Sequence, residues 1–373
     1  MNKPIKIRLH VLSPIHIGCD DVYEPTSFVI DESKKKLIEF DPVEFVKSLN
    51  KERKNKLAEI ANKGTLVSII EMYRFVYSNK AAIKGYEVDI SKNIVDRYLQ
   101  VKNMELNEKK IKQELNNFLL LRTAYLPNNN NPYIPGSSLK GAMRTGYLSM
   151  LAYSGNTDEG IKTIIENEKP RFSITGRKNA KELEKELLGG EFATDPFRML
   201  KVSDLLPVSD VKRQITYAIN MRKSDGAIRM PVPLEVISSG SFEGVLNIDT
   251  PLKESGIKRP LSWAILSALF HKHYTRVYNT EVRLKKFAVP SIEKFKDKLK
   301  TSAFLIRLGR HSGAEAVTIE GNRFIKIMQG RDKAPRYLDS ATTVWLASDE
   351  PRPKNTSNLF PFGWAVLSVE NMS

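Results

Sequence analysis

The residues with the clearest chemical meaning lie between Gly136 and Arg144, in the string GSSLKGAMR. A glycine turn that leads into a helix leaves backbone N–H groups unpaired at the positive end of the helix dipole. Ser137 and Ser138 add hydroxyl donors at this point. Lys140 and Arg144 are four residues apart and so share one face of the helix. The segment therefore predicts a phosphate-binding site, although a serine-capped helix with solvated basic side chains would explain the same residues.

Residues that could support catalysis are few. Ala142 and Met143 stand where a Walker A loop has Lys and Ser or Thr, so nucleotide hydrolysis is not predicted. Asp20 and Asp21 follow Gly18 and could assist a metal-dependent cut of RNA. Adjacent aspartates in a loop are more often turn formers or solvated charges. We therefore expect a protein that is not an enzyme, with these two aspartates as its weak catalytic candidates.

The histidines and the one cysteine do not indicate a metal or acid–base site. Cys19 alone excludes an internal disulfide and a cysteine-based zinc site. His271 and His273 are two residues apart on a predicted helix and so point in different directions. His16 stands in a strand-to-loop corner, where a core or backbone-bonded role is favoured over that of a base. We predict no metal and no cofactor.

Two further basic segments are candidate RNA contacts. Residues 306–318 combine glycines with Arg307, Arg310 and His311, and a buried turn would explain them as well. Residues 210–231 lie between two predicted strands, and a solvated polar loop is the competing interpretation. The cations of this second segment are Lys212, Arg213, Arg222, Lys223 and Arg229.

The overall charge agrees with a polyanionic partner. The chain has 373 residues, with Lys+Arg 59 and Asp+Glu 43, a net charge of +16. Nucleic acid and anionic membrane are the usual partners of such a surface. No stretch approaches the ~20 apolar residues that span a bilayer, and the first residues do not resemble a signal peptide. We therefore expect a nucleic-acid-binding protein of the reducing cytoplasm, with no membrane partner.

The elements that must position these residues follow from hydrophobic periodicity. Apolar and charged residues alternate from Ile5 to Val11, which predicts a strand. Helices are predicted from Gly136, with Ser137 or Ser138 as its cap, and from Pro260. Further strands are predicted at 28–30, 37–40, 199–206, 233–238, 242–248, 303–309, 317–321, 342–348 and 363–370.

Without insertions, the order is strand, helix, strand, strand, helix, strand. This order predicts an α+β, ferredoxin-like (RRM-like) core, with two helices on one face of an antiparallel sheet. Residues 46–125 show helical periodicity and are predicted to be a helical insertion rather than part of a sheet. The expected organisation is a core from 1–45, 126–155 and 196–373, interrupted by insertions at 46–125 and 156–195.

Four strings carry a resemblance to a known family. The string IPGSSLKGAMRT resembles the helix-start motif of repeat-associated mysterious proteins (RAMPs) in CRISPR–Cas effector complexes. The strings LHVLSPIHIG, IRLGRHSGAEAVT and PFGWAVL are similar to segments of one RAMP family, the fifth Csm subunits of type III-A complexes. These strings lie at both ends and in the middle, so the resemblance covers the whole chain. The long stretches 46–125 and 156–192 carry no motif.

The resemblance implies a role in antiviral defence. It implies a RAMP core with a basic thumb hairpin, here at 210–231, that crosses the guide–target duplex. It implies a head subunit that caps the 3′ end of the CRISPR RNA (crRNA) and acts in maturation of that end. The implied partners are crRNA, target RNA, other Csm subunits, especially the backbone RAMP subunit, and a cellular nuclease. The candidate RNA contacts are His16, Gly18, Gly136, Ser137, Ser138, Lys140, Arg144, Lys212, Arg213, Arg222, Lys223, Arg307 and Arg310.

Three alternatives stay open. A backbone RAMP subunit would cleave target RNA and would need Asp20 or Asp21. A RAMP endoribonuclease that processes precursor crRNA would need an acid–base residue such as His16. A general basic protein would have no CRISPR role at all.

Overall fold

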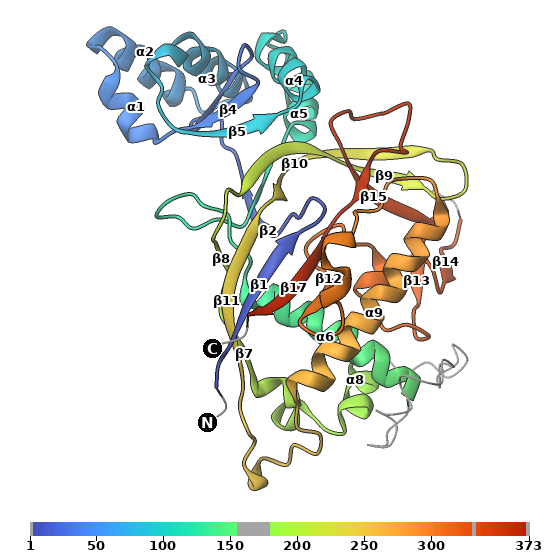
Figure 1. The fold of residues 1–373 in the computed structure, drawn as a ribbon. Helices are drawn as coiled ribbons and strands as arrows, with labels where there is room; N and C mark the ends of the chain where they lie inside the picture. The colour runs from blue at the N-terminus through green and yellow to red at the C-terminus, as the bar shows by residue number, and fades with distance from the viewer. Residues whose placement is uncertain (1–2, 155–179, 330–332, 371–373) are drawn as a thin grey trace.

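The computed structural model describes residues 3–154, 180–329 and 333–370. A body with two packed helices lies below a smaller helical head, and the two chain ends lie near each other on one side of the body (Figure 1). Among the described residues, no helix combines the length and apolar composition that crossing a membrane requires.

The body contains the predicted ferredoxin-like core. Its sheet has the order β12-β17-β1-β11-β7, with β8 beside β11 and every pairing antiparallel. The α+β, ferredoxin-like prediction is confirmed, with β17 inserted between β1 and β12. The bounds are β1 Ile5–Val11, α6 Gly136–Ser154, β7 Leu200–Val202, β8 Leu206–Pro207, β11 Ser241–Ile248, α9 Trp263–Leu284, β12 Ala303–Arg307 and β17 Trp364–Glu370.

The alternation predicted for β1 separates its two faces. Ile7 and Leu9 are fully buried beneath the helices. On the other face, Arg8 bonds to Glu243 of β11, and Lys6 pairs with Glu370 of β17 at 2.9 Å. Opposite charges directly across neighbouring strands support this register, because a slip by one residue would expose the apolar face.

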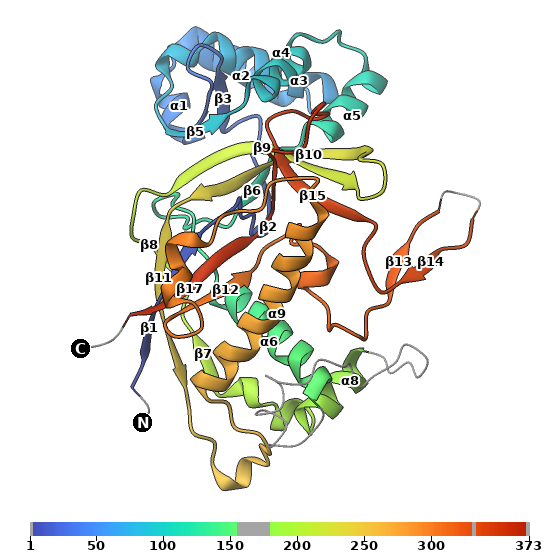
Figure 2. The same cartoon turned by 45° about the vertical axis from the view of Figure 1, so that its right-hand side comes forward.

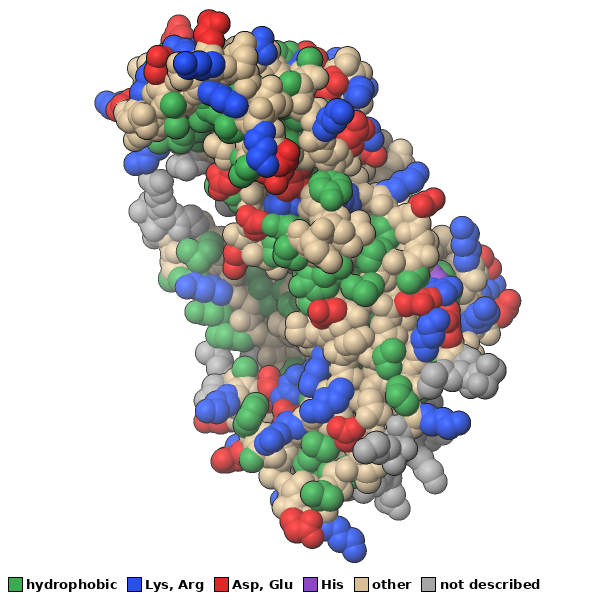
Figure 3. Space-filling view, turned by 90° about the vertical axis from the view of Figure 1, so that its left-hand side faces the viewer, with side chains coloured by type: hydrophobic (Ala, Val, Ile, Leu, Met, Phe, Trp, Pro, Cys, Tyr) green, Lys and Arg blue, Asp and Glu red, His purple; other side chains and the backbone are tan. Residues whose placement is uncertain are grey.

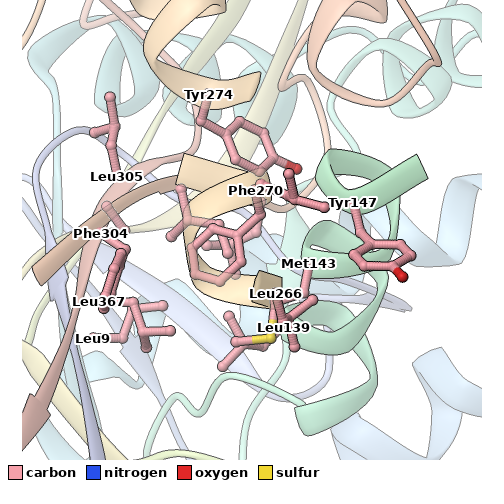
Figure 4. Close-up of a cluster of buried hydrophobic side chains, with 14 of the residues drawn as sticks. Leu9, Leu139, Met143, Tyr147, Leu266, Phe270, Tyr274, Phe304, Leu305 and Leu367 are labelled. Atoms are coloured by element: carbon pink, nitrogen blue, oxygen red, sulfur yellow. The ribbon is translucent and has the colours of Figure 1, made fainter. Parts of the chain in front are cut away.

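Helices α6 and α9 cover the buried face of this sheet through side chains spaced four residues apart (Figure 4). Each helix therefore places one apolar stripe against the strands. The labelled residues of the cluster are Leu9, Leu139, Met143, Tyr147, Leu266, Phe270, Tyr274, Phe304, Leu305 and Leu367.

A second sheet lies between the body and the head. Its order is β2-β6-β10-β9-β5-β4-β3, with β15 paired to β9 and β16 to β15. The longest strands, β9 and β10, form one twisted hairpin that curves under the head (Figure 1). The bounds are β2 Gly18–Val22, β3 Phe28–Asp31, β4 Lys36–Glu39, β5 Tyr86–Ile90, β6 Leu121–Thr123, β9 Lys212–Arg222, β10 Ile228–Ser239, β15 Thr343–Ser348 and β16 Phe360–Pro361.

The head corrects the prediction that 46–125 stays outside the sheets. Its strand β5 pairs with β4 and runs parallel to β9, and β6 runs parallel to β10. The helices pack on β3, β4 and β5 around the rings of Phe28, Tyr73 and Tyr98, which meet in edge-to-face and tilted contacts. The helix bounds are α1 Pro42–Ser48, α2 Lys51–Asn62, α3 Leu66–Ser78, α4 Lys92–Asn103 and α5 Glu108–Asn117.

Two local predictions are wrong, and a third lies partly outside the described residues. The long helix begins at Trp263 instead of Pro260, because the Ser262 side chain accepts from Ile265 N and caps it. Residues 317–321 form no strand and follow the short turn Ala314–Ala316. Of the predicted insertion 156–195, residues 155–179 lie outside the described part; beyond them, helix α8 (Ala180–Leu188) packs against α6.

Candidate nucleic-acid interface

The chain corner after β1 brings together residues from both ends of the sequence. The Arg310 backbone N–H donates to the His16 carbonyl oxygen at 2.8 Å. Gly309 has φ +88°, and a Cβ there would lie 2.7 Å from that same oxygen. Only glycine allows this close approach without displacement of the chain. The corner thereby places Gly18, which is exposed, beside the exposed Arg310.

His16 supports this corner from inside. It is 1% exposed, and its Nδ1 lies 2.8 Å from the carbonyl oxygen of Glu235. Burial lowers the pKa of His16, so the ring is neutral and donates its Nδ1 proton to that carbonyl. The ring is thus occupied inside the corner, and RNA contact at His16 stays a prediction. The hydrogen bonds to Glu235 and from Arg310 explain its place, because they make His16 a support of the corner.

Arg307 and Arg310 are three residues apart but have opposite surroundings. Arg307 is 2% exposed, and its Nη1 lies 2.5 Å from Glu281 Oε1. Trp364 Nε1 donates to the other oxygen of Glu281 at 2.9 Å. The Arg307 guanidinium is half of a buried ion pair, and RNA contact at Arg307 stays a prediction. Arg310 is exposed and makes no ion pair with a described residue.

A buried charge network lies behind the corner. Glu235 is 0% exposed and accepts from Arg213 Nη1 at 3.1 Å and from Thr123 N at 3.1 Å. Burial raises the pKa of Glu235, and the nearby arginines oppose that rise. Arg122 pairs with Glu39 at 2.6 Å and lies over the Tyr125 ring. Arg213, a candidate RNA contact, is therefore paired with Glu235 across the two strands of the hairpin, and Glu235 in turn bonds to β6.

The catalytic candidates do not assemble a metal site. Asp20 is exposed with φ +58°, a turn conformation that aspartate tolerates. Asp21 accepts from the Tyr125 hydroxyl at 2.7 Å and from Val22 N at 2.9 Å. Within residues 3–154, 180–329 and 333–370, no group of three or more His, Cys, Asp or Glu side chains could hold a metal ion.

A carboxylate of this chain already accepts a hydrogen bond from the start of α6. Gly136 N donates to Asp204 Oδ1 at 2.8 Å, and a Cβ at Gly136 would lie 2.3 Å from the Val202 carbonyl oxygen. The helix begins at Gly136, so Ser137 and Ser138 lie in its first turn and the predicted serine cap is wrong. An incoming phosphate would have to displace the carboxylate of Asp204.

The two cations of this segment are also engaged. Lys140 Nζ donates to the Leu200 carbonyl oxygen at 2.8 Å. Arg144 pairs with Glu184 at 2.8 Å and with Asp195 at 2.7 Å. The structure thus brings Lys140 and Arg144 to one place, as predicted, but surrounds them with internal acceptors. Phosphate binding at this segment stays a prediction.

The far end of the β9–β10 hairpin is tied to the body. Arg222 pairs with Asp225 at 2.6 Å, and Lys223 pairs with Glu315 at 2.9 Å. Lys286 donates to the Ser224 carbonyl oxygen at 2.9 Å. Lys212, at the base of the hairpin, is exposed. The thumb role of 210–231 stays a prediction, and its tip cations already have carboxylate partners.

The side of the molecule that carries β8 and β11 is hollowed below the head and shows basic and acidic side chains intermixed (Figure 3). Beneath the head, a cavity of about 840 Å³ is lined by Glu39, Arg122, Tyr125 and Asn130, among others. Charges of both signs therefore contribute to this face.

The buried acids were missed from the sequence. Glu235 lies inside the apolar string PLEVIS, whereas Glu281 lies among polar and exposed residues near the end of helix α9. A charged residue in an otherwise apolar string indicates a paired buried charge, and this signal was present for Glu235 alone.

With this geometry established, residues 8–324 match the RAMP superfamily. The chain belongs to the RAMP superfamily, as the ferredoxin-like core and the glycine-containing corner indicated. It is 24% identical over 404 aligned residues to the CRISPR system Cms protein Csm5 of Methanocaldococcus jannaschii, with 98% of this chain and 89% of that protein covered. It is 28% identical over 226 residues to Csm5 of Streptococcus thermophilus, with 57% and 54% covered.

Two solved structures share the fold. A chain of the Csm–crRNA–target RNA ternary complex of a type III-A CRISPR–Cas system superposes with a TM-score of 0.58 at 18% identity, with 99% of this chain and 100% of that chain covered. Csm5 of T. onnurineus gives 0.52 at 18% identity, with 96% and 99% covered. The resemblance to fifth Csm subunits is confirmed.

Proposed function

We propose that this chain is a crRNA-binding subunit of a type III-A Csm effector complex in antiviral defence, and that it caps the crRNA 3′ end. The observation that carries the proposal is similarity to Csm5 along 98% of this chain. The fold of a chain from a complex that contains crRNA and target RNA supports it. Its partners are then crRNA, target RNA and other Csm subunits, the backbone RAMP subunit above all.

The charges of the described residues favour shelter over cleavage of RNA. The net charge of +16 attracts phosphates. Arg310 at the corner and Lys212 at the base of the β9–β10 hairpin are exposed cations, whereas Asp20 and Asp21 gather no further metal ligands among the described residues. In this proposal the subunit protects the 3′ end and a recruited cellular nuclease trims it.

The test is to purify complexes assembled with and without this chain and to sequence both ends of their crRNA. We expect wrong, ragged or unprocessed 3′ ends without the chain, and an unchanged 5′ tag. Unchanged 3′ ends together with altered 5′ ends would refute the capping role and place the subunit at the opposite end of the complex.

A further inference from the structure

A small hairpin near the end of the chain stands apart from both large sheets. Strands β13 (Ile325–Ile327) and β14 (Arg336–Leu338) pair only with each other among the described strands. The hairpin projects away from the body (Figure 2). A ring contact also links the two sides of the hairpin. The rings of Phe324 and Tyr337 are stacked, with centroids 4.0 Å apart and an interplanar angle of 3°.

The register gives this hairpin one exposed aromatic face. Lys326 lies directly opposite Tyr337, so both side chains are on the same face. Strand alternation adds Phe324 and Met328 to that face. Phe324 is 39% exposed, Tyr337 43% and Met328 68%. Large apolar side chains that gather on a projecting element indicate a contact surface.

The charge around these rings favours a polyanion. Lys326, Lys333 and Arg336 are exposed, and none makes an ion pair with a described residue. Across 323–329 and 333–339, the described part of this region, Asp339 is the one carboxylate. This differs from the α6 start and the β9–β10 tip, where carboxylates pair with the cations.

We propose that the β13–β14 hairpin binds single-stranded RNA by stacking an unpaired base on the Phe324–Tyr337 pair. Tyr337 is 43% exposed, so a base can be added to its ring, and stacking of this kind tolerates any base. Lys326, on the same face, then neutralises an adjacent phosphate, with Arg336 and Lys333 along the hairpin. The inference rests on the proposed function, since it names the surface through which the chain holds RNA.

The test measures affinity of the full chain for a fluorescein-labelled single-stranded RNA of mixed sequence. Phe324→Ala with Tyr337→Ala should weaken binding about 5-fold to about 150-fold, because aromatic stacking contributes about 1–3 kcal/mol per base and 1.4 kcal/mol is tenfold. Phe324→Tyr with Tyr337→Phe keeps both rings and should bind as the natural chain does. Tyr86→Ala with Phe192→Ala removes two exposed aromatic side chains elsewhere and serves as the matched control.

A second variant tests the site without removing the stacked rings, whose loss could unfold the hairpin. Lys326→Ala with Arg336→Ala keeps the rings and should reduce the salt dependence of binding by about 0.7 per lost phosphate contact. If the natural chain binds RNA and neither variant changes affinity or salt dependence, the hairpin is not the site, while the proposed function stands. If the natural chain binds no RNA, the proposed function fails first. Unchanged RNA affinity with lost assembly into the complex would assign the hairpin to a protein partner and overturn the inference.

Discussion

The start of α6 and the β13–β14 hairpin are both basic, yet their cations are in opposite states. At the helix start, Asp204 accepts from Gly136 N, and Arg144 pairs with two carboxylates. At the hairpin, Lys326 and Arg336 are exposed beside an aromatic pair. The helix start carries the recognisable family string, and the hairpin carries none. A motif therefore identifies the fold, whereas the pairing of its charges decides what a surface can bind.

The buried ion pair should give the largest effect. Arg307→Ala leaves the carboxylate of Glu281 buried without its partner, so we expect a loss of about 3–5 kcal/mol in the free energy of unfolding. Urea unfolding measures it. The matched control is Arg310→Ala, which should change stability by less than about 0.5 kcal/mol because Arg310 is exposed. Equal stability of both variants would contradict the difference drawn between these arginines.

Acid should destabilise the core before it weakens the surface. Burial lowers the pKa of His271, His273 and His311 to about 4 each. The unfolded chain then binds protons more readily than the folded chain, so stability is complete above about pH 6.5 and is lost as the pH falls toward 4. Urea unfolding at several pH values measures this loss. His273→Phe should flatten the dependence, and an unchanged slope would refute the buried-histidine explanation.

The α6 start offers a direct test of its paired state. Lys140→Ala with Arg144→Ala removes groups that bond to Leu200, Glu184 and Asp195. We expect a stability loss of about 1–2 kcal/mol, and an RNA affinity that changes less than in the Phe324→Ala, Tyr337→Ala variant. A strong, sequence-independent loss of RNA affinity at unchanged stability would show instead that this segment grips phosphates.

The exposed corner should give a smaller, electrostatic effect. Arg310→Ala should lower RNA affinity modestly and reduce the salt slope by about 0.7, because one phosphate contact of a single strand is lost. Titration at several salt concentrations measures the slope. Arg213→Ala also removes one cation, but it does not isolate the electrostatic effect. Arg213 bonds to the buried Glu235, so its loss destabilises the hairpin. An unaltered slope for Arg310→Ala would remove the corner from the interface.

The two aspartates should give no effect on RNA integrity. Asp21 is bonded to Tyr125, Asp20 lies at the irregular register of β2 with φ +58°, and neither is set among further metal ligands in the described part of the chain. We expect the isolated chain to leave RNA intact with or without divalent metal. Cleavage that needs metal and disappears in Asp20→Ala or Asp21→Ala would establish a nuclease and revive the target-cutting alternative.

The sequence predicted the core well because periodicity and local start signals determine it. The alternation of β1 and the four-residue spacing on α6 and α9 led directly to the ferredoxin-like order. Strand β5 was missed because its pairing with β9 joins residues over a hundred positions apart, which no local pattern records. The irregular 317–321 segment has strand-forming residues but no neighbour to pair with in the described structure.

The site was less predictable, for the same reason. Arg307 and Arg310 look alike in the sequence, and only the tertiary partner Glu281 distinguishes them. The carboxylate at the α6 start comes from Asp204, 68 residues away. The Phe324–Tyr337 stack depends on a hairpin whose two strands have only three residues each, too few for a hydrophobic period to show. Charge pairs and aromatic stacks between residues that are distant in the sequence cannot be predicted until the fold shows which residues are neighbours.

The capping role is tested most directly by crosslinking within an assembled Csm complex. A photoreactive nucleotide is placed in the crRNA either near its 3′ end or within its 5′ tag, and the crosslinked subunit is identified. We predict crosslinks to this chain from the 3′ position, with loss of any that reach β13–β14 in the Phe324→Ala, Tyr337→Ala variant. Crosslinks from the 5′ tag alone would contradict the account.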